Sequence, residues 1–382
     1  MKKIVALFLA LTLCVGLAAC SGGSSASGNS QAGEAASGPI KVDVFWYTYS
    51  DTYLTNVRNA MEESLAGMAD AITYTMHDCE NDQAKQTQKI DTALTQGTDL
   101  LIVNIVTTGS EEAAQAIVDK AKEAGVPILF FNREVSDAVV NSYEKCAFVG
   151  TDADEAGYMQ GEMIAAYLLA EENWTDGASR FDLDKDGKID YIMFRGEHGN
   201  AEAFGRTKYS VEEANRLLAE SGKGLTLVPS PANTTSTQYE DDGISNYFLY
   251  GNWSSAEAAN LMRTALSSFT LASGDIELII ANNDDQALGA IEAMNEEGYN
   301  TGAEDAAGYI PTFGVDATPV AVEAITSGAM TGTIKQDAQG MSDCILYLAG
   351  NIAAGKEIMA ETDAYNIDEG VSKIRIPYAI VT

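Results

Sequence analysis

Short apolar runs rich in β-branched residues alternate along the chain with segments of helical periodicity. The apolar runs have the length of strands and span residues 41–47, 100–106, 127–132, 191–195, 278–282 and 312–315. Helix-like segments at 54–66, 110–124 and 284–297 lie between several of them. Such alternation is typical of parallel sheets that carry helices on both faces. The pattern therefore predicts an α/β fold built from doubly wound parallel sheets.

Polar residues follow several of these predicted strands. In folds of this kind ligands bind beyond the carboxyl ends of the strands. The polar residues at or shortly after such ends are Asp51, Asn132, Arg206, Asn283 and Asp316. The set contains no obvious pair of nucleophile and base, so we expect a binding site rather than an enzyme active site.

The first forty residues predict export and membrane attachment. Lys2 and Lys3 precede an apolar run, and small residues then lead to Leu17-Ala18-Ala19-Cys20. This order is typical of a signal peptide, here residues 1–19, and the apolar run is too short to span a bilayer. Cys20 is placed as in bacterial lipoproteins, where it becomes the acylated first residue. Residues 20–38 predict a flexible Gly/Ser-rich linker. The alternative is an ordinary signal peptide with an incidental cysteine.

The formal net charge of -33 narrows the choice of partners. Such an acidic surface repels nucleic acid and anionic substrates. We therefore expect no nucleic-acid partner, and a DNA-binding regulator is excluded. Cys79, Cys146 and Cys344 are widely spaced and odd in number, so we expect them to be small buried hydrophobic residues rather than disulfide partners.

Residues 182–190, DLDKDGKID, match the opening of an EF-hand calcium loop. Gly187 stands at place 6, where the loop turns sharply, and the carbonyl of Lys188 can serve as the ligand at place 7. The carboxylates at places 1, 3, 5 and 9 are Asp182, Asp184, Asp186 and Asp190. This spacing predicts a structural calcium ion. The alternative is a solvated acidic turn without a metal.

The end of this loop departs from an EF-hand. Place 12 is Met193 instead of a glutamate, and residues 189–194 are typical of a strand rather than an exit helix. A remote carboxylate must then complete the site. We expect Glu277 to be this residue, because it precedes the apolar run 278–280, which is expected to form a neighbouring strand.

Several motifs in the same order resemble the bacterial galactose/glucose-binding proteins, a family of periplasmic sugar-binding proteins. They are ENDQAKQ (80–86), FFNRE (130–134), VGTD (149–152), the DLDKDGKID loop, ANND (281–284), FGVD (313–316) and RIPY (375–378). The resemblance covers essentially all of residues 40–380. In the family a distant glutamate before the ANND motif completes the calcium site, and Glu277 occupies that position.

The resemblance implies two α/β lobes joined by a hinge of three crossover strands, the type I fold of periplasmic binding proteins. The N-terminal lobe would comprise residues 39–150 and 337–371. The C-terminal lobe, with the calcium loop, would comprise residues 151–336 and 372–382. The sugar would bind in the cleft between the lobes.

Family resemblance also implies the sugar site. Tyr53 and Trp253 would enclose the pyranose ring between their aromatic faces. Asp51, Asn132, Arg206, Asn283 and Asp316 match the polar ligands of the hydroxyl groups, although Asp51, Asn283 and Asp316 could instead be helix caps.

Three positions of the site depart from the family. Asn200 stands where the family has a histidine, Glu202 replaces an aspartate, and Gln336 replaces an asparagine. Each residue keeps its capacity to form hydrogen bonds but changes its reach. These three positions therefore leave the identity of the preferred sugar undetermined.

These features together predict a monomeric, membrane-anchored extracytoplasmic lipoprotein that binds a hexose such as glucose or galactose. It would deliver the sugar to the permease of an ABC transporter. One alternative is a sensory subunit that presents the sugar to a chemoreceptor or sensor kinase. Another is a glycosidase that uses Asp51 and Asp316 as paired carboxylates.

Overall fold

The structure is a computed structural model that describes residues 38–233, 248–269, 273–302 and 308–382. The expected signal peptide, Cys20 and all but the last residue of the expected linker lie outside these residues. Within the described ranges, no helix has both the length and the apolar character needed to cross a bilayer.

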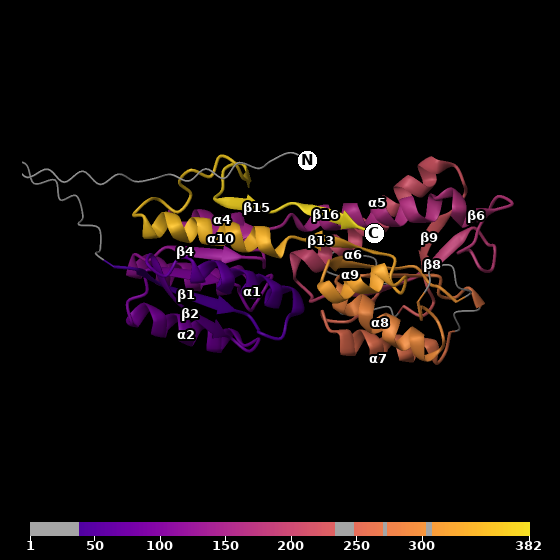
Figure 1. Ribbon diagram of the computed structural model, residues 1–382, viewed down its shortest axis with the longest axis horizontal. Helices are drawn as coiled ribbons and strands as arrows, with labels where there is room; N and C mark the ends of the chain where they lie inside the picture. Colours follow the sequence, from indigo (N-terminus) through magenta and orange to yellow (C-terminus); the bar gives the residue numbers. More distant parts are fainter. Residues whose placement is uncertain (1–37, 234–247, 270–272, 303–307) are drawn as a thin grey trace, which may run out of the picture. The chain divides into compact units, whose positions relative to one another are not determined.

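The first lobe is built on a seven-stranded sheet (Figure 1). Its strand order is β14-β15-β5-β4-β3-β1-β2, and every pairing is parallel except that of β14 with β15. The strands are β1 (Ile40–Trp46), β2 (Ile72–Asp78), β3 (Leu100–Val103), β4 (Ile128–Phe131), β5 (Cys146–Gly150), β14 (Asn366–Ile367) and β15 (Lys373–Arg375). Its helices are α1 (Thr52–Ala66), α2 (Gln83–Thr95), α3 (Glu111–Ala124), α4 (Asp137–Asn141) and α10 (Ala338–Ala353).

The second lobe contains a sheet of order β10-β8-β11-β12-β13-β16, to which β9 adds by pairing with β8. The strands are β8 (Lys188–Arg195), β9 (Thr226–Pro229), β10 (Leu249–Tyr250), β11 (Leu278–Ala281), β12 (Thr312–Asp316), β13 (Gly332–Gln336) and the antiparallel β16 (Tyr378–Val381). A separate hairpin pairs β6 (Trp174–Thr175) with β7 (Ala178–Ser179). The helices are α5 (Ala153–Leu169), the 3₁₀ turn η1 (Glu171–Asn173), α6 (Ala201–Ser221), α7 (Ser255–Leu266), α8 (Asp284–Glu296) and α9 (Pro319–Thr326).

Helices cover both faces of each sheet. In the first lobe, α1 and α10 pack Leu54 and Ile345 on one face, while α2 and α3 pack Ile90 and Ile117 on the other. The second sheet lies in the same way between α5 with α6 and α7 with α8. Each of the six predicted strands and three predicted helices is present, with small shifts of the bounds, so the prediction of a doubly wound fold is confirmed. Cys79, Cys146 and Cys344 are buried and free, as expected.

The chain passes between the two lobes three times. β5 of the first sheet leads into α5, β13 of the second sheet leads into α10, and β15 of the first sheet leads into β16 of the second. The expected boundary after residue 371 is wrong, because Ile374 pairs with Val149 in the first sheet. The third crossing lies instead between Arg375 and Tyr378. Residues 374–376, Ile-Arg-Ile, alternate apolar and charged side chains and suit a strand of either sheet, so their pattern does not reveal which sheet they join.

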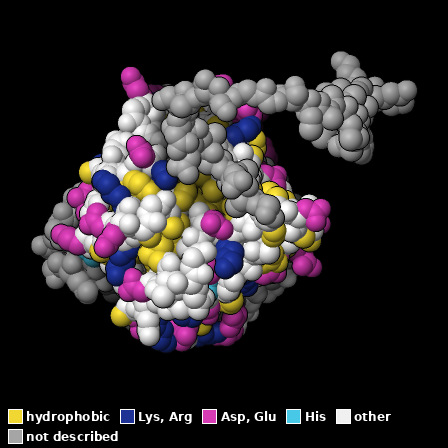
Figure 2. Space-filling model, turned by 90° about the vertical axis from the view of Figure 1, so that its left-hand side faces the viewer, with side chains coloured by type: hydrophobic (Ala, Val, Ile, Leu, Met, Phe, Trp, Pro, Cys, Tyr) yellow, Lys and Arg dark blue, Asp and Glu magenta, His cyan; other side chains and the backbone are white. Residues whose placement is uncertain are grey.

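A second cavity lies at the C-terminal end of α10. Its apolar lining includes Ile352, Ile358 and Met359, and Lys145 and Lys356 also border it. Figure 2 shows the left-hand side of Figure 1, where hydrophobic side chains gather between charged side chains of both signs. None of the predicted site residues lines this cavity.

Candidate functional site

All ten residues predicted for the sugar site line one cavity between the two lobes. The empty space within it is about 400 Å³. The lining comprises Asp51, Tyr53, Asn132, Asn200, Glu202, Arg206, Trp253, Asn283, Asp316 and Gln336, together with Tyr47 and Arg133. The carboxyl ends of β1, β4, β8, β10, β11, β12 and β13 lead to these residues, as expected for a ligand site in such folds.

Three of these residues also cap helices that begin at the cavity. Oδ1 of Asp51 accepts from the backbone N–H of Leu54, and Oδ2 accepts from the Tyr47 hydroxyl, both at 2.8 Å. Asn200 and Asn283 cap α6 and α8 in the same way. The helix-cap alternative is thus confirmed for Asp51 and Asn283, but not for Asp316, because Thr318 caps α9. Capping occupies one side-chain atom and fixes the direction of the other.

Arg206 provides a buried positive charge at the site. It lies within α6 rather than shortly after a strand, so its expected place was wrong. Nη1 donates to the carbonyl of Asn282 at 2.9 Å and lies 3.8 Å from Oδ1 of Asp316. Burial alone would lower the pKa of Arg206, but Tyr378 and Asp316 raise it above its ordinary value. The guanidinium therefore stays charged although only 3% of the residue is exposed.

Arg133 supplies a second guanidinium from the first lobe. Its Cζ lies 4.0 Å from the centre of the Tyr47 ring, and its Nη2 forms an ion pair with Glu197 of the second lobe. The strand-end argument could have identified Tyr47 and Arg133, since they closely follow β1 and β4. It missed them because an aromatic residue and an arginine next to a motif asparagine carry no distinct signal.

Both guanidiniums that line the cavity carry buried N–H groups without a partner in the part of the chain that the structure describes. Nε and Nη1 of Arg133 and Nε of Arg206 have no hydrogen-bond partner among the described residues. Burying such a donor without a partner costs about 1–3 kcal/mol. These groups are therefore suited to a ligand that offers acceptor oxygens.

Three of the cavity residues have a positive backbone φ. Asn132, Trp253 and Asp316 have positive φ values of 60°, 63° and 124°. Asparagine adopts a φ near 60° readily. For Trp253, and for Asp316 at its larger φ, the conformation is strained, and strain of this kind clusters at functional sites. The indole of Trp253 lies against the backbone of Gly196, where an added Cβ would come within 2.3 Å of the ring.

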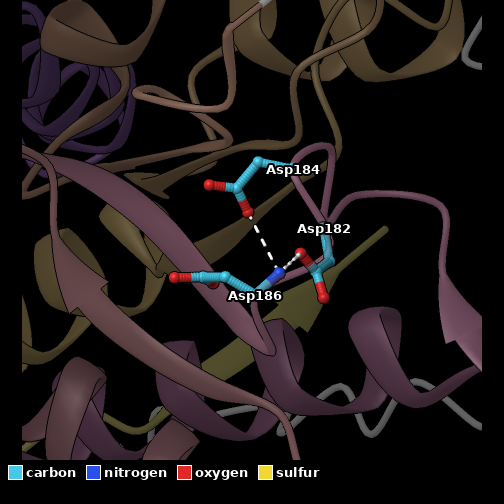
Figure 3. A group of neighbouring side chains, drawn as sticks. All are labelled: Asp182, Asp184 and Asp186. Carbon is cyan, nitrogen blue, oxygen red and sulfur yellow. Dashed lines mark hydrogen bonds between the residues drawn. The ribbon is translucent and has the colours of Figure 1, made fainter.

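The acidic loop before β8 brings together three of the four predicted loop carboxylates, and Asp190 is not among them. Ligand oxygens of Asp182, Asp184 and Asp186 lie within 4.8 Å of one another. Figure 3 shows the backbone nitrogen of Asp186 donating to both Asp182 and Asp184, each at 3.1 Å. Gly187 has φ +83°, which the sharp turn requires.

Glu277 reaches this loop from the neighbouring chain segment. Its two carboxylate oxygens accept from the backbone N–H of Leu183 at 2.5 Å and of Asp190 at 2.9 Å. The residue is 1% exposed. Lys188 and Asp190 open β8, as the strand-like pattern of 189–194 indicated. This donor set, all oxygen and mostly anionic, suits a hard divalent cation.

Comparison with known proteins places the chain in a family. Residues 42–357 match the family model of the periplasmic binding protein domain. A D-galactose/methyl-galactoside binding periplasmic protein of Haemophilus influenzae is 33% identical over 91% of both chains. A putative rhizopine-binding protein of Rhizobium meliloti is 27% identical over 87% of both.

Solved structures agree. An ABC transporter solute binding protein from Bacillus halodurans, with bound myo-inositol, is 26% identical and superposes with a TM-score of 0.65. The alignment covers 91% of this chain and 95% of that one. The chain therefore belongs to the periplasmic binding protein family, as a sugar-binding protein of the ABC transporter type.

Proposed function

We propose that this protein captures a hexose, glucose or galactose, between its two lobes and delivers it to the permease of an ABC transporter. The observation that carries the proposal is the convergence of buried, unpaired guanidinium N–H groups with carboxylates and aromatic rings around one cavity. A sugar ring offers hydroxyls that both donate and accept hydrogen bonds, and C–H faces that suit aromatic rings.

The charges of the cavity support an uncharged ligand. Asp51, Glu202 and Asp316 provide acceptors, and Arg133 and Arg206 provide donors. Hydrogen bonds that involve a charged partner are the stronger ones, so neutral hydroxyls can be held tightly without a net ligand charge. The Haemophilus relative is named for D-galactose, which supports a hexose here.

Calcium is the proposed structural cofactor. Asp182, Asp184 and Asp186, the carbonyl of Lys188, Asp190 and Glu277 would hold the ion. Clustered carboxylates repel one another, and a bound cation would offset this repulsion and hold the loop against Glu277. The ion would stabilise the second lobe without touching the sugar.

Membrane attachment through an acylated Cys20 is also part of the proposal. It rests on the sequence before residue 39, where a signal-like segment ends at this cysteine. A short flexible linker would then keep the folded lobes near a membrane permease. Radiolabelled palmitate incorporation in cells, lost in Cys20→Ala, would test the anchor.

Isothermal titration calorimetry tests the binding function. D-glucose, D-galactose, myo-inositol, D-xylose and D-ribose are titrated into the calcium-loaded protein. We expect one-to-one binding of glucose or galactose, and loss of that binding in Asp316→Ala. An exposed substitution such as Asp363→Ala serves as the matched control. Absence of heat with both hexoses would contradict the proposed ligand.

A further inference from the structure

A closed ring of hydrogen bonds lies behind the cavity, and three of its four members come from the three crossings between the lobes. Thr151 follows β5 at the first crossing, Gln336 ends β13 at the second, and Tyr378 begins β16 at the third. Arg206 is the fourth member. These four side chains are buried, with Thr151 completely inaccessible.

Every hydrogen bond of this ring joins a donor to an acceptor. Nη2 of Arg206 donates to Oε1 of Gln336 at 3.1 Å and to the Tyr378 hydroxyl at 3.0 Å. Nε2 of Gln336 and the Tyr378 hydroxyl both donate to Oγ1 of Thr151, at 3.2 and 2.9 Å. One guanidinium nitrogen and one hydroxyl thus join all three crossings.

Thr151 connects this ring to a second cavity residue. Having accepted two hydrogen bonds, its hydroxyl has one proton left, and it donates that proton to Oε1 of Glu202 at 3.2 Å. Its carbonyl accepts from Nη1 of Arg375 at 2.8 Å, which ties the first crossing to the third by a further bond. Thr151 is not among the residues that line the cavity, but it bonds Glu202 directly and is linked to Arg206 through Gln336 and Tyr378.

We infer that Thr151 is a positioning residue that couples the hinge to the sugar site. The ring holds the second-lobe ends of all three crossings together, and rotation of one lobe against the other changes backbone angles at these crossings. In the orientation described, the same ring and the bond to Glu202 fix Arg206 and Glu202 beside the cavity. Sugar binding and lobe closure then stabilise each other, because the sugar binds more tightly to the closed form than to the open form.

This inference rests on the proposed function, and its test uses the wild-type ligand identified by calorimetry, with D-galactose as the first probe. Thr151→Val keeps the shape of the side chain but removes the acceptor of two bonds and the donor of a third. We expect the dissociation rate of the sugar to rise at least roughly ten-fold, with an association rate changed less than about three-fold, because such effects act mainly on dissociation. Stopped-flow tryptophan fluorescence measures both rates.

Companion variants separate positioning from mere structural damage. Tyr378→Phe opens the same ring elsewhere, so it should show the same kinetic change, and the double variant should lose little more than the worse single one. Thr151→Ser keeps the hydroxyl and should return the dissociation rate to within about three-fold of wild type. Thr331→Val is the matched control, since its buried hydroxyl bonds Tyr309 and the backbone of Thr312 away from the cavity.

The outcomes distinguish the two proposals. If the wild-type protein binds no hexose, the proposed function fails. If it binds a hexose and the folded Thr151→Val and Tyr378→Phe variants release it at the wild-type rate, the coupling role is overturned. It is equally overturned if Thr151→Ser or Thr331→Val is as impaired as Thr151→Val.

Discussion

Arg133 of the first lobe and Glu197 of the second form an ion pair across the cavity. A 2.6 Å hydrogen bond from the Thr52 hydroxyl to Asp285 also joins the two lobes. Gly109 of the first lobe and Gly199 of the second meet so closely that a Cβ at Gly109 would lie 2.9 Å from the carbonyl oxygen of Gly199. Direct contacts between the lobes therefore add to whatever a ligand contributes to closure.

Removing the charge of Glu197 should make the closed form less stable. In Glu197→Gln the ion pair is lost while the shape is kept, and hydrogen bonds to charged groups contribute about 1.5–3 kcal/mol. We expect the sugar to dissociate roughly ten-fold faster, measured by stopped-flow fluorescence. Glu220→Gln, on the outer surface of α6, is the control. A dissociation rate equal to that of wild type would show that this pair does not hold the lobes together.

Trp253 should dominate the binding energy. Buried aromatic anchors commonly contribute 2 kcal/mol or more, so Trp253→Ala should weaken calorimetric affinity at least roughly thirty-fold. Gly196→Ala should act similarly, because its new methyl group would displace the indole. Trp174→Ala, in the β6–β7 hairpin, should bind as wild type does. Full affinity in Trp253→Ala would remove the indole from the proposed site.

Calcium removal should lower the melting temperature by about 5 °C, the shift expected when a ligand present at a hundred times its dissociation constant is withdrawn. Differential scanning calorimetry with and without EGTA measures it. Asp184→Asn should lose this response and, in EGTA, melt no lower than wild type, because one repelling carboxylate is gone. Asp70→Asn is the control. A melting temperature that is the same with and without EGTA would contradict the proposed calcium ion.

The raised pKa of Asp284 predicts that the free energy of unfolding depends on pH. Burial raises its pKa to about 7, although Thr333 and Thr318 donate hydrogen bonds to it. The folded state thus binds the proton more tightly than the unfolded state, whose aspartate titrates near pH 4. The stabilisation is fully present below about pH 4 and is lost as the pH rises through about 7.

Urea unfolding of wild type and Asp284→Asn between pH 4 and 8 checks this sign. The neutral variant should gain stability relative to wild type as the pH rises, while Asp285 and Asp316 nearby are kept in both. Asp363→Asn, on the surface, provides the reference. A stability difference that is constant with pH would show that Asp284 is ionised throughout.

The sequence predicted the parallel sheets and several of the cavity residues well, for a physical reason. Strands buried on both faces give short apolar runs, and the residues after them must meet at one edge of the sheet. Asp51, Asn132, Asn283 and Asp316 are placed by this rule alone. Family resemblance added Tyr53, Trp253 and the three residues that depart from the family.

Other features depended on geometry that no local pattern contains. Arg206 reaches the cavity from within a helix, and residues 373–375, Lys-Ile-Arg, join the first sheet although this short segment suits a strand of either lobe. The role of Thr151 follows only from side chains that are distant in sequence. Gln336 was expected to bind the sugar. Its amide oxygen already accepts a hydrogen bond from Arg206, and its amide nitrogen already donates one to Thr151.

A crystal structure of the protein grown with D-galactose is the sharpest test of sugar binding between the lobes. We expect one sugar in the cavity between the lobes, with its ring between Tyr53 and Trp253 and its hydroxyls bonded to Arg206 and Asp316. A sugar bound on an outer surface, or one in the cleft that contacts neither Arg206 nor Asp316, would contradict it.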